Sequence, residues 1–233
     1  MPKHAVRIVF ISAILFFSIS FLPAARADTG VDLIKAHAIC DGSFFGALAT
    51  DARRWSQEPA FKRRNGLAFF QVKNRNTAGP AENDDATVKF HAPHSVAGLP
   101  LTAYFDSDLS RWRYFSDHDL NFVTWGFYVG RTPAAVMTWL SKNAPGIWNA
   151  LMQARPGTPD GMYCEVEVFE QGRWQASAEA CDQALPVDAT PHRVFAVRPR
   201  PNSGENDESI LSCELWGVLP KDLLKMSRPD LPR

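Results

Sequence analysis

The sequence predicts an α+β protein, an antiparallel β-rich body with two or three packed helices that is disulfide-bonded. Three observations support this fold class. Short runs rich in Val, Ile, Thr and aromatic residues alternate with turn-forming stretches, which is typical of antiparallel strands. A few segments carry apolar residues at helical spacing. The chain has 4 cysteines, all of them after residue 27, and an even number of cysteines favours paired thiols.

The N-terminus has the pattern of a secretory signal peptide. Lys3 and Arg7 form a positively charged start, and an apolar run from Ile8 to Leu22 follows. The small-x-small sequence Ala25–Ala27 then suits a signal peptidase. The run is shorter than the ~20 residues that span a bilayer, which disfavours a membrane anchor. We therefore expect residues 1–27 to be removed and the mature chain to begin at Asp28 in a periplasmic or secreted location.

The mature chain divides into two halves that can form one domain. We expect an N-terminal α+β half over residues 28–154 and a C-terminal, hairpin-rich half over residues 162–233. Residues 155–161 between them contain two Pro and two Gly and are a possible linker.

In the N-terminal half, apolar spacing predicts a helix over residues 41–56 with Asp41 or Ser43 as its N-cap. Thr132 and Pro133 predict the start of a second helix, and a short helical stretch over 147–153 follows it. The predicted strands are Leu67–Val72, Thr87–His91, Leu99–Phe105 and Asn121–Val129.

In the C-terminal half, the pattern predicts two hairpins and a final helix. One hairpin pairs residues 163–169 with 174–180 through a type II′ turn at Gly172-Arg173. The other pairs residues 193–197 with 210–216, and the helix covers 221–226.

Four cysteines allow three pairings, and we favour Cys164–Cys181 with Cys40–Cys213. A turn at Gly172-Arg173 places Cys164 opposite Cys181 at a distance that suits a bridge. The side-chain pattern conflicts with this register, because Cys164 alternates with valines and Cys181 with polar residues. The conflict indicates a shifted register or a bulge.

Charge and motifs exclude several functions. The full chain has 25 basic and 25 acidic residues, and loss of residues 1–27 leaves 22 and 25, a formal net charge of −3. That balance provides no basic face for nucleic acid. Common hydrolase and nucleotide-binding motifs are absent from the sequence. We predict no cofactor and no membrane span after signal cleavage.

The alternative enzymatic interpretation is a cysteine-dependent cell-envelope hydrolase, an amidase or peptidase. Cys40 precedes the first predicted helix, where the helix N-terminus stabilises a thiolate. His91 or His94 would act as its base. Cys40 as half of a disulfide is the favoured interpretation.

A second alternative is a metal site at His91, His94 and His118. His91 and His94 lie on one predicted strand, whose alternation places the two rings on opposite faces. A turn at Pro93 would bring the rings together. His118 lies between two aspartates in a polar loop, a pattern that is usually solvated.

The strongest binding candidates are Arg111, Trp112, Arg113 and Tyr114. Aromatic and arginine side chains dominate interface hot spots. If this segment is an edge strand, alternation places Trp112 and Tyr114 together on one side. We therefore expect a non-enzymatic, exported binding protein that recognises another protein or a cell-envelope component.

Overall fold

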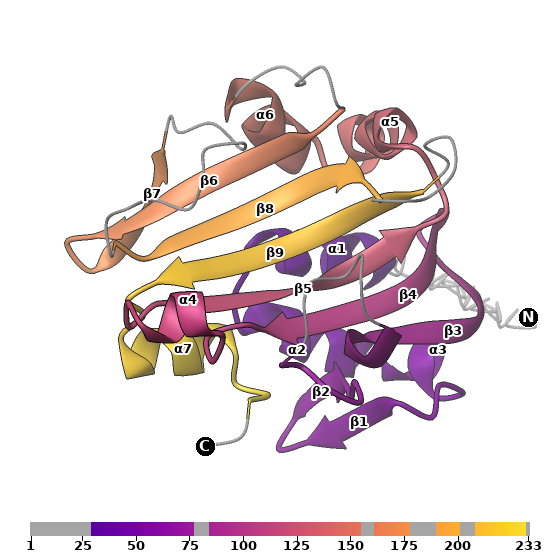
Figure 1. The fold of residues 1–233 in the computed structure, drawn as a ribbon. Helices are drawn as coiled ribbons and strands as arrows, with labels where there is room; N and C mark the ends of the chain where they lie inside the picture. Colours follow the sequence, from indigo (N-terminus) through magenta and orange to yellow (C-terminus); the bar gives the residue numbers. More distant parts are fainter. Residues whose placement is uncertain (1–28, 77–83, 155–160, 178–189, 201–207, 232–233) are drawn as a thin grey trace, which may run out of the picture.

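A single antiparallel sheet organises the protein (Figure 1). The computed structural model describes residues 29–76, 84–154, 161–177, 190–200 and 208–231. Seven strands pair in the order β3-β4-β5-β9-β8-β6-β7, and a separate two-stranded hairpin consists of β1 and β2. The strands are β1 (Phe61–Arg64), β2 (Leu67–Phe70), β3 (Thr87–Val96), β4 (Leu99–Asp108), β5 (Asn121–Val129), β6 (Tyr163–Glu170), β7 (Arg173–Ser177), β8 (His192–Pro199) and β9 (Ser209–Gly217).

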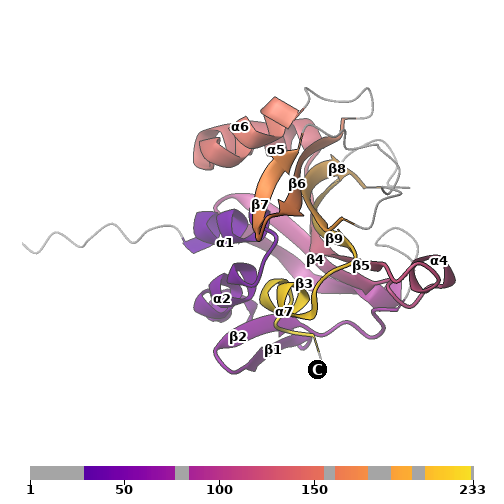
Figure 2. The ribbon, with the colours of Figure 1, turned by 90° about the vertical axis from the view of Figure 1, so that its left-hand side faces the viewer.

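Helices cover one face of this sheet (Figure 2). α1, α2, α5 and α6 lie on that side, and the short α4 lies on the other side. The helices of the described residues are α1 (Thr29–Ala38), α2 (Ser43–Thr50), α3 (Ala52–Trp55), α4 (Arg113–Ser116), α5 (Pro133–Asn143), α6 (Pro145–Ala154) and α7 (Lys221–Ser227), with a 3₁₀ turn over Asp84–Ala86. The fold class is confirmed, with more helices than the two or three expected from the sequence.

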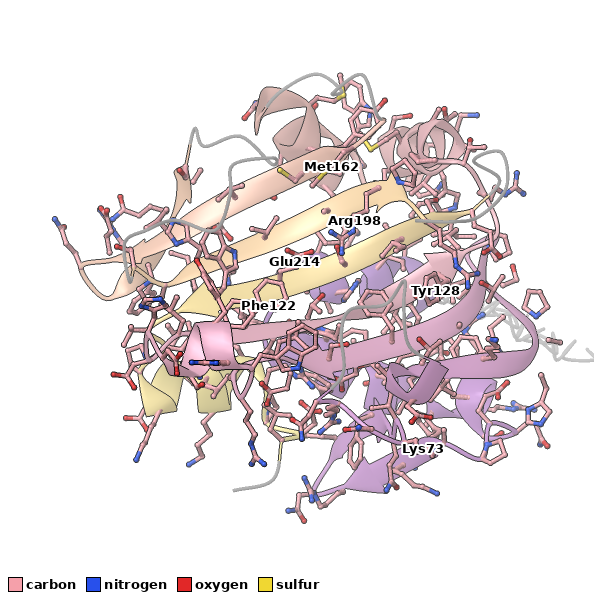
Figure 3. The ribbon with its side chains drawn as sticks, viewed as in Figure 1. Lys73, Phe122, Tyr128, Met162, Arg198 and Glu214 are labelled. Atoms are coloured by element: carbon pink, nitrogen blue, oxygen red, sulfur yellow. A yellow bond between two sulfur atoms is a disulfide. The ribbon has the colours of Figure 1, made fainter. Side chains whose placement is uncertain are left out.

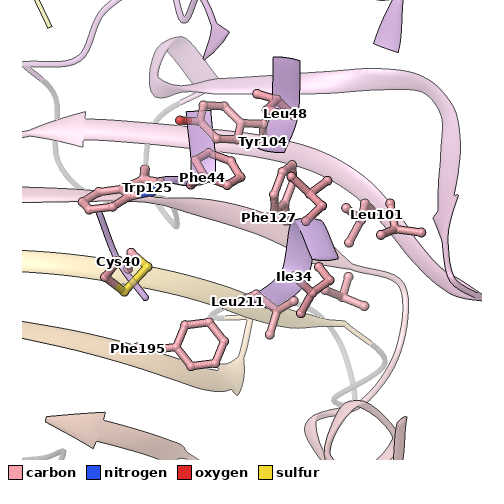
Figure 4. Packing of buried hydrophobic residues seen from close by; sticks show 14 of the residues in the cluster. Ile34, Cys40, Phe44, Leu48, Leu101, Tyr104, Trp125, Phe127, Phe195 and Leu211 are labelled. Carbon is pink, nitrogen blue, oxygen red and sulfur yellow. A yellow bond between two sulfur atoms is a disulfide. The ribbon is translucent and has the colours of Figure 1, made fainter. Parts of the chain in front are cut away.

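The main core lies between the sheet and the helices of its covered face (Figure 4). It joins Ile34 of α1 and Phe44 of α2 to Phe127 of β5, Phe195 of β8 and Leu211 of β9, all of which are buried. Burial of large aromatic side chains is a major source of stability. Strands from both sequence halves contribute to this core, because β8 pairs with β9 and β9 pairs with β5 in one continuous sheet.

Local signals predicted several elements at their observed positions. α5 begins where Thr132 caps it, with Thr132 Oγ1 accepting from the Ala135 backbone N–H at 3.2 Å. The hairpin of β8 and β9 has the predicted partners, with His192 opposite Trp216 and Val197 opposite Leu211. α7 also lies where the sequence places it.

The helix predicted over residues 41–56 is two helices, α2 and α3. The chain leaves helical geometry at Asp51, which has φ −91° and ψ 19°. The Asp51 carboxylate pairs there with Arg54, at 2.5 Å from its Nε atom. The change of direction lets the Trp55 ring reach the core, where it is fully buried. Tertiary packing therefore divides a continuous helical pattern.

The turn between β6 and β7 differs from the prediction by one residue. Its central residues are Gln171 and Gly172, with φ 51° and 79°, because Glu170 pairs with Arg173. Positive φ at both central positions defines a type I′ turn, whose twist suits a hairpin. The turn register on which the Cys164–Cys181 pairing was predicted is therefore shifted by one residue, although Cys164 is itself disulfide-bonded. Cys181 lies outside the described residues, as do the predicted linker at 155–160 and the predicted signal peptide.

The C-terminal segment is anchored on α2 by a close backbone approach. The Gly42 N–H donates to the Met226 carbonyl at 3.1 Å. A Cβ atom at Gly42 would lie 2.4 Å from that oxygen, so only glycine fits there. This contact holds α7 against the edge of the core. Within the described part of the chain, no helix is long and apolar enough to cross a membrane.

Candidate functional site

A disulfide joins Cys40 to Cys213, the pairing that the sequence favoured. It links the residue that follows α1 and its turn to the middle of β9, across a sequence separation of 173 residues. The nucleophile of a cysteine hydrolase is a thiolate, which a disulfide sulfur cannot supply. The structure therefore contradicts a catalytic Cys40, and no described cysteine carries a free thiol.

His91 and His94 meet on one carboxylate, that of Glu58. Glu58 Oε2 lies 3.1 Å from His91 Nδ1, and Glu58 Oε1 lies 2.6 Å from His94 Nε2. A bulge in β3 makes this possible, because four residues from Phe90 to Pro93 face only Thr102 of β4. Pro93 lacks an N–H and cannot extend the ladder. The bulge cancels the alternation that would separate the rings.

This cluster ties the turn between α3 and β1 to the sheet edge. Burial raises the pKa of Glu58, but hydrogen bonds with His94 and His91 outweigh it and hold that pKa below its ordinary value. His94 also packs on Trp55, with ring centroids 4.7 Å apart. Among the described residues, no hydroxyl or thiol forms a hydrogen bond with either ring, so the cluster lacks a nucleophile.

His118 does not join the other two histidines. Its ring lies 5.5 Å from that of Tyr114, beside α4, and it forms no hydrogen bond with Glu58. The three histidines considered as an alternative metal site therefore do not form one cluster. No group of three or more potential metal ligands is found within the described ranges.

The candidate binding segment forms a helical turn, α4, where an edge strand was considered. Asp108 Oδ1 accepts from the Ser110 backbone N–H at 3.1 Å, and Ser110 Oγ accepts from that of Phe122 at the same distance. These side-chain bonds replace strand pairing directly after β4. The backbone N–H of Ser116 then donates to the Trp112 carbonyl at 2.8 Å, which closes the turn.

The turn exposes aromatic residues while Phe115 anchors it. Trp112 is 39% exposed and Tyr114 is 57% exposed. Phe115 is buried and stacks on Phe122, with ring centroids 5.3 Å apart, where Figure 3 shows Phe122 beside α4. The Arg113 side chain is almost fully exposed and lies 3.5 Å from Asp117. The helical turn therefore places Phe115 in the core and leaves Trp112 and Tyr114 exposed to solvent.

A buried network of charges lies at the C-terminal end of β4, where Asp106 pairs with Arg228. Arg228 Nη2 donates to both oxygens of Asp106, at 3.0 and 2.9 Å, and Arg228 Nε donates to Asp230 at 2.9 Å. Arg75 contacts both aspartates, at 2.9 and 3.0 Å. The guanidinium of Arg228 also stacks over Trp125 at 4.8 Å. Burial alone would lower the pKa of Arg228, but the two carboxylates raise it well above its ordinary value.

The sequence alone did not identify Glu58 or Arg228 as site residues, nor Lys221 and Lys225 of α7. Glu58 precedes a proline in a polar stretch, and Arg228 follows a short helix, so both resemble solvated residues. Their partners lie 36 and 122 residues away in the chain. No local pattern indicates that Asp106, the partner of Arg228, is buried.

Three kinds of comparison were made with known proteins. No family model matches the chain, and neither the curated proteins nor the solved structures give a match.

Proposed function

We propose that this is an exported, disulfide-stabilised, non-enzymatic binding protein that recognises another protein or a cell-envelope component through α4. The observation that carries the proposal is the exposure of Trp112 and Tyr114 on a turn whose Phe115 is fixed in the core. A rigidly supported pair of exposed aromatic rings beside arginine loses little conformational entropy on binding. Arg111 and Arg113 flank Trp112 and supply donors for acidic or polar groups of the partner.

Export is supported by two features. Residues 1–27 have the charged, apolar and small-residue regions of a signal peptide. The Cys40–Cys213 disulfide is of a kind that persists in oxidising compartments. Cell fractionation with mass analysis of the purified chain tests this part, and we expect a mature N-terminus at Asp28. A full-length chain retained in the cytoplasm would contradict it.

Binding is tested with the mature protein immobilised as bait for envelope extracts. The variant carries Trp112→Ser and Tyr114→Ser. The matched control is Ile39→Ser, because Ile39 is 45% exposed and directly follows α1, a helix on the other side of the sheet from α4. A component captured by wild type is identified, purified and titrated by calorimetry. We expect the double variant to weaken its binding at least ~30-fold, since two anchors at ~1 kcal/mol each or more are removed.

The control variant should bind as wild type does. Equal binding by the double variant would place the interface elsewhere and contradict the proposal. Turnover of an envelope substrate that one side-chain change abolishes would contradict its non-enzymatic part.

A further inference from the structure

A cavity of about 580 Å³ lies between β2, the end of β4 and α7. Arg111 lines it, so it adjoins the α4 turn directly through the chain. Its walls combine apolar side chains, among them Leu67 and Leu224, with the cations Lys221 and Lys225. The volume is in the range of cavities that hold small organic ligands, roughly 300–1,000 Å³.

The accessible charge of this cavity is positive. Arg111, Lys221 and Lys225 are exposed, and none forms an ion pair with an acidic side chain of the described residues. Asp108 is the one carboxylate in the lining, and its Oδ1 already accepts from the Ser110 N–H. Three unpaired cations around one carboxylate attract an anion, because a bound negative charge reduces the electrostatic repulsion between the cations.

Arg228 is the buried member of the lining. It is 1% exposed, and Asp106 and Asp230 compensate its charge. Its Nη1 atom nevertheless has no hydrogen-bond partner in the described structure. Buried donors of this kind are normally satisfied, so an unpartnered donor on a residue that lines the cavity supports an acceptor bound there. An acidic oxygen is the strongest acceptor for a guanidinium.

We propose that this cavity binds an anionic amphiphile, a molecule with one carboxylate or phosphate group and a short apolar chain. Lys221, Lys225 and Arg111 hold the acidic group, and the chain lies along Leu67 and Leu224. The inference rests on the proposed function and names the chemistry of the envelope component that binds beside α4. Carboxylate and phosphate share this recognition, since both accept several charged hydrogen bonds.

Isothermal titration of the mature, oxidised protein at low salt tests the proposal with four probes: octanoate, octyl phosphate, neutral octyl glucoside and inorganic phosphate. We expect at least one of the two anionic octyl compounds to bind ~10-fold or more tightly than both octyl glucoside and inorganic phosphate. Preference for octanoate or for octyl phosphate identifies the acidic group. Equal binding of all octyl probes, tighter binding of inorganic phosphate, or no binding at all would overturn the proposal.

Substitution of the two lysines of α7 tests whether the probe binds in this cavity. Lys221→Gln with Lys225→Gln should weaken the anionic probe about tenfold, because two exposed ion pairs are lost. Lys142→Gln on the distant α5 is the matched control and should change nothing. Undiminished binding by the double variant would overturn the assignment. The two proposals can fail separately. If no probe binds but the Trp112 and Tyr114 variant still loses binding to the envelope component, this inference is overturned and the proposed function remains.

Discussion

Arg228 and His37 are both ionisable side chains buried in this protein, and they avoid an isolated charge in opposite ways. Arg228 keeps its charge, because Asp106 and Asp230 bind it at 2.9–3.0 Å. His37 is fully buried among the rings of Phe44, Phe127 and Phe195. Burial lowers its pKa to about 4, although the carbonyl of Leu211 acts in the opposite direction.

The contrast follows from what each group can do. A guanidinium cannot lose its proton at ordinary pH, so its burial requires carboxylates. An imidazole can become neutral, so it packs as an aromatic ring and needs only one acceptor. His37 Nε2 donates to the Leu211 carbonyl at 3.3 Å. Stability should therefore depend on charge pairing at Arg228 and on pH at His37.

The largest effect is expected from Asp106→Asn. The change leaves two guanidinium groups with one carboxylate inside the protein, and breaking a buried pair costs about 3–5 kcal/mol. Urea unfolding at pH 7 measures the loss. The double change Arg228→Met with Asp106→Leu is the control, and it should cost less than the sum of its single changes. Additive losses would show that the two residues do not act as a pair.

Acid should destabilise the protein through His37. The pKa of His37 is 6.5 when exposed and about 4 in the fold. The unfolded chain therefore takes up a proton first as pH falls, and about 3 kcal/mol of stability is lost between pH 6.5 and pH 4. Unfolding free energies measured across this range test the effect. His37→Gln keeps a donor for Leu211 and should remove this part of the pH dependence; an unchanged slope would assign it to other groups.

Glu58 is an intermediate case, a buried carboxylate whose partners reach the surface. Its folded pKa lies below the ordinary 4.5, so its ionised form stabilises the fold above that pH. Glu58→Gln should cost about 1–2 kcal/mol at pH 7, the size of a lost charged hydrogen bond. The difference between wild type and variant should shrink as pH falls below 4.5 and through the folded pKa. A difference that does not shrink at any pH below 4.5 would identify packing as its cause.

The smallest losses of stability are expected from substitutions of His91 and His94, and the two losses should differ. The His91 side chain is 71% exposed, whereas that of His94 is 17% exposed and packs on Trp55. His91→Ala should cost less than about 0.5 kcal/mol, because polar contacts of exposed side chains contribute little. His94→Ala should cost about 1–2 kcal/mol, since it also removes buried contacts. Thermal unfolding at pH 7 gives both values, and equal losses would contradict the difference in burial.

The sequence by itself determined the fold class and the elements whose signals are local. Thr132 and Pro133 carry the start signal of α5 in their own side chains, and runs rich in β-branched and aromatic residues predict the strands over 121–129 and 210–216. It also favoured the Cys40–Cys213 disulfide, as the pairing that remains when a hairpin joins Cys164 to Cys181, although the structure shifts that hairpin turn by one residue. The helix and strand predictions succeed because capping and the local side-chain pattern depend on neighbouring residues.

The tertiary structure alone decided what the polar residues do. Arg228 is buried because folding pairs it with Asp106, which lies 122 residues earlier in the chain. Glu58 contacts two histidines because the bulge between Lys89 and His94 brings their rings to one side of β3. The Arg111–Tyr114 segment became a helical turn because Ser110 bonds to Phe122. Burial of a charge depends on partners that the chain brings together only on folding, and no local pattern contains that information.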